Sequence, residues 1–365
     1  SFDSRQRFDA FVGALQAVVD RQGVLRTAVY WEGLSQAVQV VWRKATLLVE
    51  TLELNAGQDA LEQLKERMAK MPLQMNLQQA PLIQISVAQQ AGEHRCYCLL
   101  LEHHIISDHV SLDVMFEEVS AVLSGQQDRL AAPVPYRDFV AHSLAKSEWH
   151  DAEAYFRAEL GDVTEPTAPF GLVDVHGDGL GIEEARRPLE QGLSARVRAV
   201  VQRLGMSPAS LFHVAWALVL AQSSGRDDVV FGSVMSGRMG GIAGVDRMMG
   251  LFINTLPVRL RLKGKSVHDA MRAMQQTLVD LMKYEQTPLA EVQRYSGVSG
   301  GVPLFSALLN YRHSKPIEEE AAFAGVELID AQERTNYPFD VSVNDLREGF
   351  LLTAQTQADV IGPQR

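Results

Sequence analysis

The sequence is poor in the features that mark several large classes of protein. Only two of its 365 residues are cysteine, and a single residue separates Cys96 from Cys98, so we expect neither a disulfide framework nor a zinc pair. No apolar run approaches the length of a membrane span, and the first residues do not read as a signal peptide. These absences favour a cytoplasmic protein whose thiols are reduced.

Positive charge is also scarce. Lys and Arg total 34 against 45 Asp and Glu, which gives a formal net charge of −11. Because binding to nucleic-acid phosphates requires a basic surface, this balance argues against nucleic acid as the main partner.

The length and composition indicate two lobes. A chain of 365 residues that is 46% hydrophobic exceeds one typical core. Between residues 161 and 184 the chain is rich in Gly, Asp, Pro and Thr, as expected for an exposed connector. We therefore predict one lobe over residues 1–170 and a second over 171–365.

Apolar periodicity predicts an α/β fold in which helices pack on sheets. Helical spacing alternates along the chain with short β-branched runs and with strict apolar and polar alternation. The predicted helices span residues 8–21, 110–123, 207–224 and 267–282, and the predicted strands span 38–49, 96–101, 229–234, 251–262, 339–343 and 350–354.

The clearest chemistry lies in residues 101 to 111, which read Leu-Glu-His-His-Ile-Ile-Ser-Asp-His-Val-Ser. This run ends an apolar strand and opens an amphipathic helix, and a rigid strand end holds a reactive group well. Successive strand side chains point to opposite faces, so His103 and His104 are not expected to share one cavity. A buried neutral histidine pair without a reactive role is the alternative, and diverging side chains disfavour a metal site.

Further segments accompany this motif in a fixed order. They are Val24-Leu25-Arg26-Thr27, Tyr136-Arg137-Asp138-Phe139, Val229 to Gly232 followed by Ser236-Gly237-Arg238, Gly250 to Pro257, Tyr284-Glu285-Gln286 with Pro288, Pro303-Leu304-Phe305, and Leu309-Asn310-Tyr311. In order and spacing, the series resembles the condensation domains of nonribosomal peptide synthetases.

The resemblance implies two lobes, each similar to chloramphenicol acetyltransferase, in a V-shaped pseudo-dimer with the active site at the junction. In this family a tunnel crosses the junction, and upstream and downstream peptidyl carrier proteins dock at its two mouths. Their phosphopantetheine arms carry the substrates, so the domain itself binds no cofactor and no metal. The acceptor aminoacyl amine attacks the donor thioester, and an amide bond forms. The bulk charge is acidic, so carrier proteins would be met through local basic patches.

The resemblance also implies roles for individual residues. His104 is the reactive histidine, either as the base that takes the amine proton or as the group that holds the nitrogen in line. His103 and Asp108 are structural, and Asp108 is expected to form an ion pair with Arg26.

A second set of residues is expected near the tunnel. Ser236, Gly237 and Arg238 are candidates for its lining, and Asn254 for a turn near the lobe junction. Simple packing or turn chemistry explains these residues equally well.

The chain departs from the family pattern at Arg21-Gln22-Gly23, which stands for the usual Arg-His-Glu and is expected to matter only for packing, and after the motif aspartate. Where the family usually has glycine after the motif aspartate, this chain has His109, which would narrow the tunnel or add a second acid or base. The first strand of the family is not found at the start and the chain stops early, so we expect an excised domain.

Three functional hypotheses remain beside simple condensation. His109, the connector around Gly177-Asp178-Gly179 and the run from Leu308 to Ser314 are similar to condensation domains that also epimerise the donor residue. A non-catalytic platform that recruits a tailoring enzyme to a carrier-bound amino acid is a different class, which the intact His104 disfavours. A stand-alone acyltransferase that uses coenzyme A fits the second-lobe motifs less well.

Overall fold

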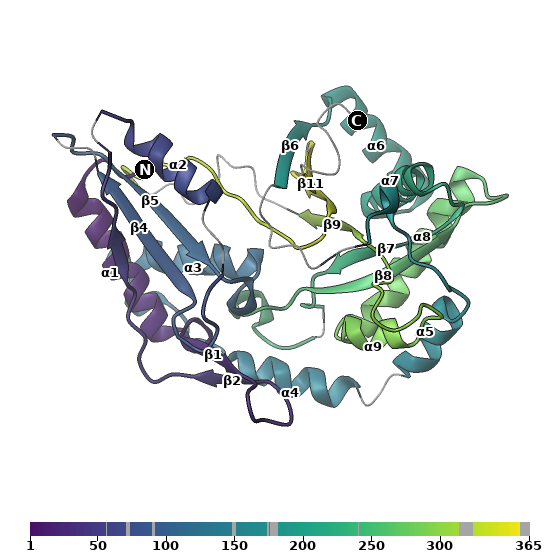
Figure 1. Ribbon diagram of the computed structural model, residues 1–365, viewed down its shortest axis with the longest axis horizontal. Helices are drawn as coiled ribbons and strands as arrows, with labels where there is room; N and C mark the ends of the chain where they lie inside the picture. The colour runs from purple at the N-terminus through teal and green to yellow at the C-terminus, as the bar shows by residue number, and fades with distance from the viewer. Residues whose placement is uncertain are drawn as a thin grey trace. The chain divides into compact units, whose positions relative to one another are not determined.

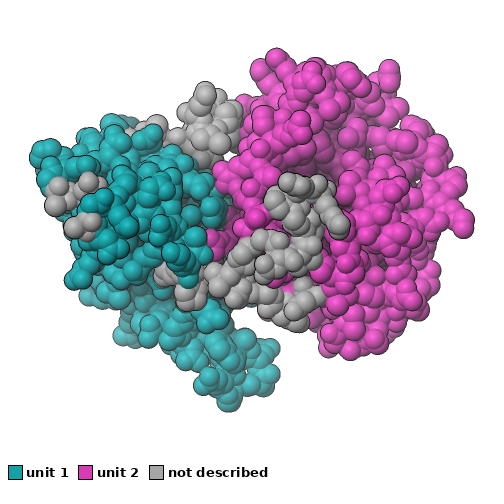
Figure 2. All heavy atoms as spheres, turned by 45° about the horizontal axis from the view of Figure 1, so that its top comes forward, with its two compact units in different colours: residues 1–142, 241–252, 317–332 teal, residues 143–240, 253–316, 333–365 magenta. Residues whose placement is uncertain are grey.

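The computed structural model describes residues 1–55, 57–70, 74–89, 92–147, 151–173, 175, 182–239, 241–313 and 324–357. The chain divides into two compact units, which Figure 2 shows in different colours. Unit 1 contains Ser1–His142, Gly241–Phe252 and Ile317–Gln332, and unit 2 contains Ser143–Gly240, Ile253–Pro316 and Glu333–Arg365.

Unit 1 combines helices with two small sheets (Figure 1). Its elements are α1 (Arg5–Arg21), η1 (Gly23–Arg26), β1 (Thr27–Tyr30), β2 (Val38–Val41), β3 (Val49–Thr51), α2 (Ala60–Lys70), β4 (Ile83–Gln89), β5 (Cys96–Glu102), η2 (His104–Ile106), α3 (His109–Leu123), η3 (Gln127–Arg129), the start of α4 (Tyr136–Ser147) and η5 (Val245–Arg247). β1 pairs with β2, and β4 lies between β3 and β5.

The sheet β3-β4-β5 is covered on both faces. Ile85 and Val87 of β4 lie opposite Leu100 and Cys98 of β5, and these side chains belong to the core that α1 and α3 close. The alternate residues, among them Ala88, pack in a second cluster with α2. The period of two along each strand thus produces two apolar faces, as a buried strand requires.

Unit 2 is built on a six-stranded sheet with the order β6-β11-β10-β9-β7-β8. Its elements are α5 (Ala152–Leu160), η4 (Pro169–Gly171), β6 (Ile182–Pro188), α6 (Gln191–Leu204), α7 (Pro208–Ser224), β7 (Asp228–Met235), β8 (Asn254–Arg261), α8 (Val267–Leu281), η6 (Met282–Tyr284), α9 (Leu289–Arg294), β9 (Ala307–His313), β10 (Phe339–Asp345) and β11 (Phe350–Gln357). β9 runs parallel to β7 and β10, and the other pairs are antiparallel.

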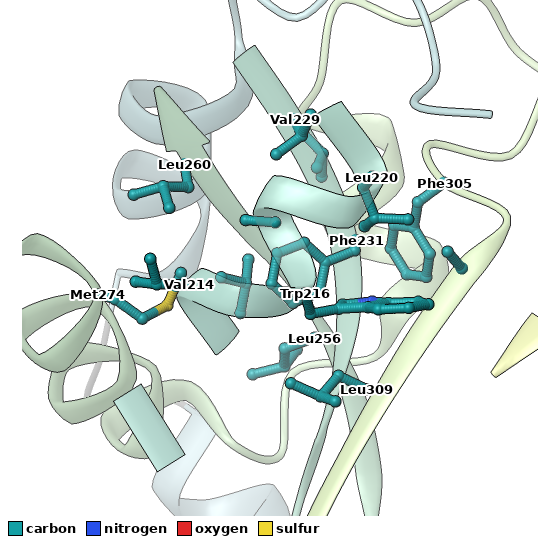
Figure 3. Close-up of a cluster of buried hydrophobic side chains, with 14 of the residues drawn as sticks. Val214, Trp216, Leu220, Val229, Phe231, Leu256, Leu260, Met274, Phe305 and Leu309 are labelled. Carbon is teal, nitrogen blue, oxygen red and sulfur yellow. The ribbon is translucent and has the colours of Figure 1, made fainter. Parts of the chain in front are cut away.

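The core of unit 2 forms where α7 and α8 pack on this sheet, as Figure 3 shows. Ser207 caps α7 by accepting a hydrogen bond from Ser210 N, and the helix ends at Gly225, whose φ of 68° suits glycine. Trp216 of α7 and Phe231 of β7 are both buried in the cluster. The helix predicted to start at Ser207-Pro208 is confirmed at both ends.

Most predicted elements are confirmed, but one strand is divided. The stretch 38–49 forms β2 and the first residue of β3, with an irregular segment between them. The predicted hairpin is present as β10 and β11, which pair from Phe339 with Thr356 to Asp345 with Phe350.

The division into units differs from the predicted boundary between residues 170 and 171. Phe156 and Leu160 of α5 pack in the core of unit 2, and Thr167 forms a β-bridge with Phe305, so the segment before residue 170 belongs to unit 2. Two later segments return to unit 1, which no local composition signal marks. The Gly177-Asp178-Gly179 run lies outside the described residues.

No single helix in the described part of the chain is long and apolar enough to cross a membrane. Taken together, α6 and α7 have the length and composition for a span, but they are bent by 111°.

Strand β10 carries polar side chains on the face turned away from the core that α7 and α8 cover. Val341 and Val343 of β10 face the core, so Asp340 and Ser342 point to the other side. Asp340 is only 5% exposed, and no hydrogen bond is found for it among the described residues. Burial, assisted by nearby Glu333, raises its pKa to about 7.

We predict that Asp340→Asn removes a pH-dependent loss of stability. A carboxyl whose pKa rises from 3.8 to about 7 on folding costs nothing below pH 3.8. It destabilises the folded state progressively as the pH rises from 3.8 to about 7, and the loss is complete above pH 7. The free energy of unfolding of the variant minus that of the wild type should therefore be larger at pH 8 than at pH 4, by on the order of 3 kcal/mol. Urea unfolding at pH 4 and at pH 8 measures these free energies, and Asp128→Asn, at an exposed aspartate, is the control. The prediction is contradicted if Asp340→Asn differs from the wild type by the same amount at both pH values.

Candidate active site

The end of β5 leads directly into the histidine motif. His103 N donates to the Leu82 carbonyl oxygen at 3.1 Å, and its Nδ1 accepts from Ile105 N at 3.1 Å, which caps η2. Burial, with a smaller effect of His104, lowers the pKa of His103 and so favours the neutral ring that can accept this bond. His103 therefore shapes the turn, and a purely structural role in the reaction stays a prediction.

His104 is partly buried and is oriented by the backbone of its own turn. Its Nδ1 lies 2.5 Å from the carbonyl oxygen of Ser107. Because a carbonyl oxygen can only accept, Nδ1 carries the proton in the neutral ring, and Nε2 carries the lone pair. The geometry thus assigns Nε2 as the nitrogen that can take a proton from a substrate.

Asp108 joins the motif to two other segments of unit 1. It is the N-cap of α3, where its Oδ1 accepts from Ser111 N and from Ser111 Oγ, both at 2.8 Å. Its Oδ2 accepts from Phe252 N at 3.3 Å. With only 2% of the residue exposed, these bonds compensate the buried charge.

The segment Gly241–Phe252 brings a second motif against α3. Ser111 Oγ lies 2.8 Å from the Gly250 carbonyl oxygen and accepts from Gly250 N at 3.0 Å. Gly250 has a φ of 153°, and a Cβ there would collide with the Tyr136 ring, whose hydroxyl donates to the Leu251 carbonyl oxygen. Phe252 continues this contact with Phe139, at 4.4 Å between ring centroids. Three motifs that are far apart in the sequence therefore support one another.

The predicted ion pair between Arg26 and Asp108 is not the one found. The Arg26 guanidinium donates to the carbonyl oxygens of Val19, Trp42 and Arg43 at 3.0, 2.6 and 3.0 Å. Arg26 therefore links the end of α1 to the segment after β2. It does not pair with Asp108, because these three carbonyl oxygens accept the hydrogen bonds that its guanidinium donates.

His109 occupies the first position of α3, directly after the cap. This position requires helical backbone angles, which any residue adopts, so the glycine usual at this place in the family is not needed for conformational freedom. Its roles as a tunnel constriction or a second acid or base stay predictions.

The predicted tunnel residues lie in unit 2, where they form turns. Gly237 follows β7 with a φ of 66°, its carbonyl oxygen accepts from Gln286 Nε2 at 3.1 Å, and Ser236 Oγ accepts from Arg238 N at 3.3 Å. Asn254 begins β8, and its Nδ2 donates to the carbonyl oxygens of Glu285 and Thr287 at 2.9 and 2.7 Å. These contacts give the residues structural roles, and lining of a tunnel stays a prediction.

Glu102 is a site residue that the sequence reasoning did not single out. It is the last residue of β5, and its buried Oε2 makes no hydrogen bond to any described residue. Burial raises the pKa of Glu102 to about 7, which His104 opposes and Asp108 supports. The available signal was one acidic residue that closes the apolar run from Cys96 to Leu101.

A metal centre is not part of this arrangement in the described ranges. No group of three or more His, Cys, Asp or Glu side chains there has the geometry to hold an ion.

We predict that Asp108→Ala destabilises unit 1 more than an ordinary cap substitution does. Removing the carboxylate takes a partner from Ser111 N and from Phe252 N, and a cap substitution alone typically costs about 1 kcal/mol. We expect the free energy of unfolding to fall by roughly 3 kcal/mol. The matched control is Asp151→Ala, because Asp151 is an exposed N-cap that accepts from Ala154 N at 2.8 Å. Equal losses in the two variants, measured by urea unfolding, would contradict the cross-linking role of Asp108.

Comparison with known proteins agrees with this picture. The family model described as "Condensation domain" matches residues 2–359. Malpibaldin synthetase of Mortierella alpina is 43% identical over 97% of this chain, and a linear gramicidin synthase of Brevibacillus parabrevis is 31% identical over 91% of it. The chain spans only 6% and 4% of the length of these two relatives.

Solved structures share the fold. The X-domain from teicoplanin biosynthesis aligns with a TM-score of 0.80 and 17% identity, over 100% of this chain and 85% of that one. The first condensation domain of the CDA synthetase aligns with a TM-score of 0.75 and 18% identity, over the same shares. The expected two-lobed α/β fold is confirmed, and the predicted nonribosomal peptide synthetase membership agrees with the synthetase relatives. The chain belongs to the family of condensation domains.

Proposed function

We propose that this domain forms an amide bond between an acceptor aminoacyl thioester and a donor peptidyl thioester, each tethered to a carrier protein by a phosphopantetheine arm. The observation that carries the proposal is the bond between His104 Nδ1 and the Ser107 carbonyl oxygen, which leaves the Nε2 lone pair as the base. The family membership supports the reaction class.

The reaction needs one proton acceptor and one leaving group. The α-amine of the acceptor attacks the thioester carbonyl carbon, and its nitrogen passes a proton to Nε2 of His104 as the C–N bond forms. The C–S bond then breaks, and the departing sulfur takes the proton back from the imidazolium. Atoms and charge balance, and His104 returns to its neutral form.

The surrounding residues make this geometry available without taking part in the chemistry. The Ser107 carbonyl oxygen accepts from Nδ1 in the neutral ring and in the imidazolium alike, so it holds the ring throughout the cycle. His103 and Asp108 fix the turns before and after His104. Positioning of this kind lowers the barrier because the reacting atoms already lie in order.

The partners and surroundings follow from the same proposal. The substrates arrive on upstream and downstream peptidyl carrier proteins, beside neighbouring synthetase domains, and the domain binds no cofactor of its own. The cytoplasmic location expected from the sequence agrees with this use and stays a prediction.

We predict that His104→Ala lowers peptide transfer between two loaded carrier proteins by at least ~100-fold, because general base catalysis contributes about 10²–10⁴-fold. Mass spectrometry of the downstream carrier measures the product. The matched control is His268→Ala, an exposed histidine of α8 in unit 2, which should transfer at the wild-type rate.

Two results would contradict the proposed catalysis. Transfer by His104→Ala at the wild-type rate would remove the base from the mechanism. A folded wild-type domain that binds matched carriers and transfers nothing would favour the recruiting platform instead.

Epimerisation of the donor residue is a separate prediction, suggested by His109 and by the sequence from Leu308 onward. A domain with both activities should exchange the donor α-proton with deuterated water before the amide bond forms. Mass spectrometry of the recovered donor thioester detects the added mass. Intact condensation without any exchange would show a domain that condenses only.

A further inference from the structure

Glu102 has an unusual environment for a carboxyl group. Its Oε2 is buried and makes no hydrogen bond to a described residue. Buried carboxyl oxygens are normally hydrogen-bonded, because an unsatisfied one costs free energy that the fold must supply elsewhere. Such an exception calls for a physical explanation.

The place of Glu102 in the sheet suggests one. It pairs with Ile83 at the end of β5 and lies on the face that Cys98 and Leu100 share, toward the core closed by α1 and α3. His104 follows two residues later, after the chain has left the strand.

The charges that act on Glu102 belong to the motif itself. Within the described part of the chain they are His104, which favours the ionised carboxylate, and Asp108, which disfavours it. Among the described residues, no charged group of α1, α2 or β4 shifts the pKa of Glu102. Glu102 ends β5 and His104 begins η2 two residues later, and the Glu102 carboxyl oxygen Oε2 is buried, where Coulomb interactions are strong.

We propose that Glu102 is a positioning residue for His104: its buried carboxylate stabilises the positive charge that the imidazole acquires when Nε2 takes the proton of the attacking amine. The inference rests on the proposed function, because that reaction is what places a charge on His104. The Ser107 carbonyl oxygen meets the ring at Nδ1, and Glu102 adds a full negative charge nearby.

The pKa of Glu102, about 7, links this effect to pH. Above pH 7 the carboxyl is ionised and assists the imidazolium, and in the same range the α-amine of the acceptor, with an ordinary pKa of about 7.7–8.0, becomes a free nucleophile. Below pH 7 both groups are protonated and the assistance is lost. Transfer should therefore rise with pH more steeply than the amine alone requires.

The experiment compares Glu102→Gln with the wild type in the whole domain. Glutamine keeps the shape and removes the charge, and Glu32→Gln removes one exposed charge as the control. Side-chain ¹⁵N NMR of histidine-labelled protein, assigned with His104→Gln, follows the protonation of His104. We expect its titration midpoint to fall by about one pH unit in Glu102→Gln, since a nearby opposite charge favours the charged form, and to stay unchanged in Glu32→Gln.

Transfer rates provide the second readout. We expect Glu102→Gln to be slower than the wild type by about tenfold at pH 8, as one pH unit corresponds to a factor of ten, and nearly equal to it at pH 6. Glu102→Asp, which retains a carboxylate, should recover part of both effects and serves as the test if the glutamine variant does not fold.

An unchanged His104 midpoint in a folded Glu102→Gln domain would overturn the inference, as would a rate loss of the same size at pH 6 and pH 8. The NMR result does not depend on transfer. A shifted midpoint in a domain whose wild type transfers nothing would therefore count against the proposed function and not against the coupling.

Discussion

The Asp108 carboxylate is the interaction on which the rest of the site depends. It caps α3 through Ser111, and it accepts from Phe252 N, which comes from a segment about 140 residues later in the chain. Both bonds are buried, so their loss would leave donors without water to replace the acceptor. Because Asp108 follows Ser107 directly, the carbonyl oxygen that orients His104 is held by the same cap.

In this arrangement the groups that position the site differ from the groups that exchange protons. The polar atoms that fix the turn are backbone groups, the Asp108 carboxylate and the Ser111 hydroxyl, and none of these needs to change its protonation. In the proposed reaction His104 gains and loses a proton, and the Glu102 carboxyl, whose pKa burial raises to about 7, sets the charge beside it. A rigid frame with two titrating groups can tune a proton transfer without moving the backbone.

Local signals in the sequence were sufficient for most of the fold. The apolar run before Glu102 and the helical spacing after Asp108 identified β5 and α3, and Ser207-Pro208 identified the start of α7, because caps and periodicity act over a few residues. The partner of Arg26 was assigned wrongly, since three carbonyl oxygens compete for its donors only once α1 and the segment after β2 have come together. The passage of Gly241–Phe252 into unit 1 is likewise a product of tertiary packing, which no short pattern encodes. For Glu102 the apolar run before it was the only local signal, and its burial depends on the packing around β5.

In the proposed reaction His104 acts through Nε2 because the Ser107 carbonyl oxygen holds the proton on Nδ1. Side-chain ¹⁵N NMR of the wild-type domain at a pH where His104 is neutral tests it directly, since the protonated and unprotonated ring nitrogens give distinct signals. We expect a protonated Nδ1 and an unprotonated Nε2 in His104. A neutral His104 with its proton on Nε2 would contradict it, because that nitrogen would then have no lone pair to accept the amine proton.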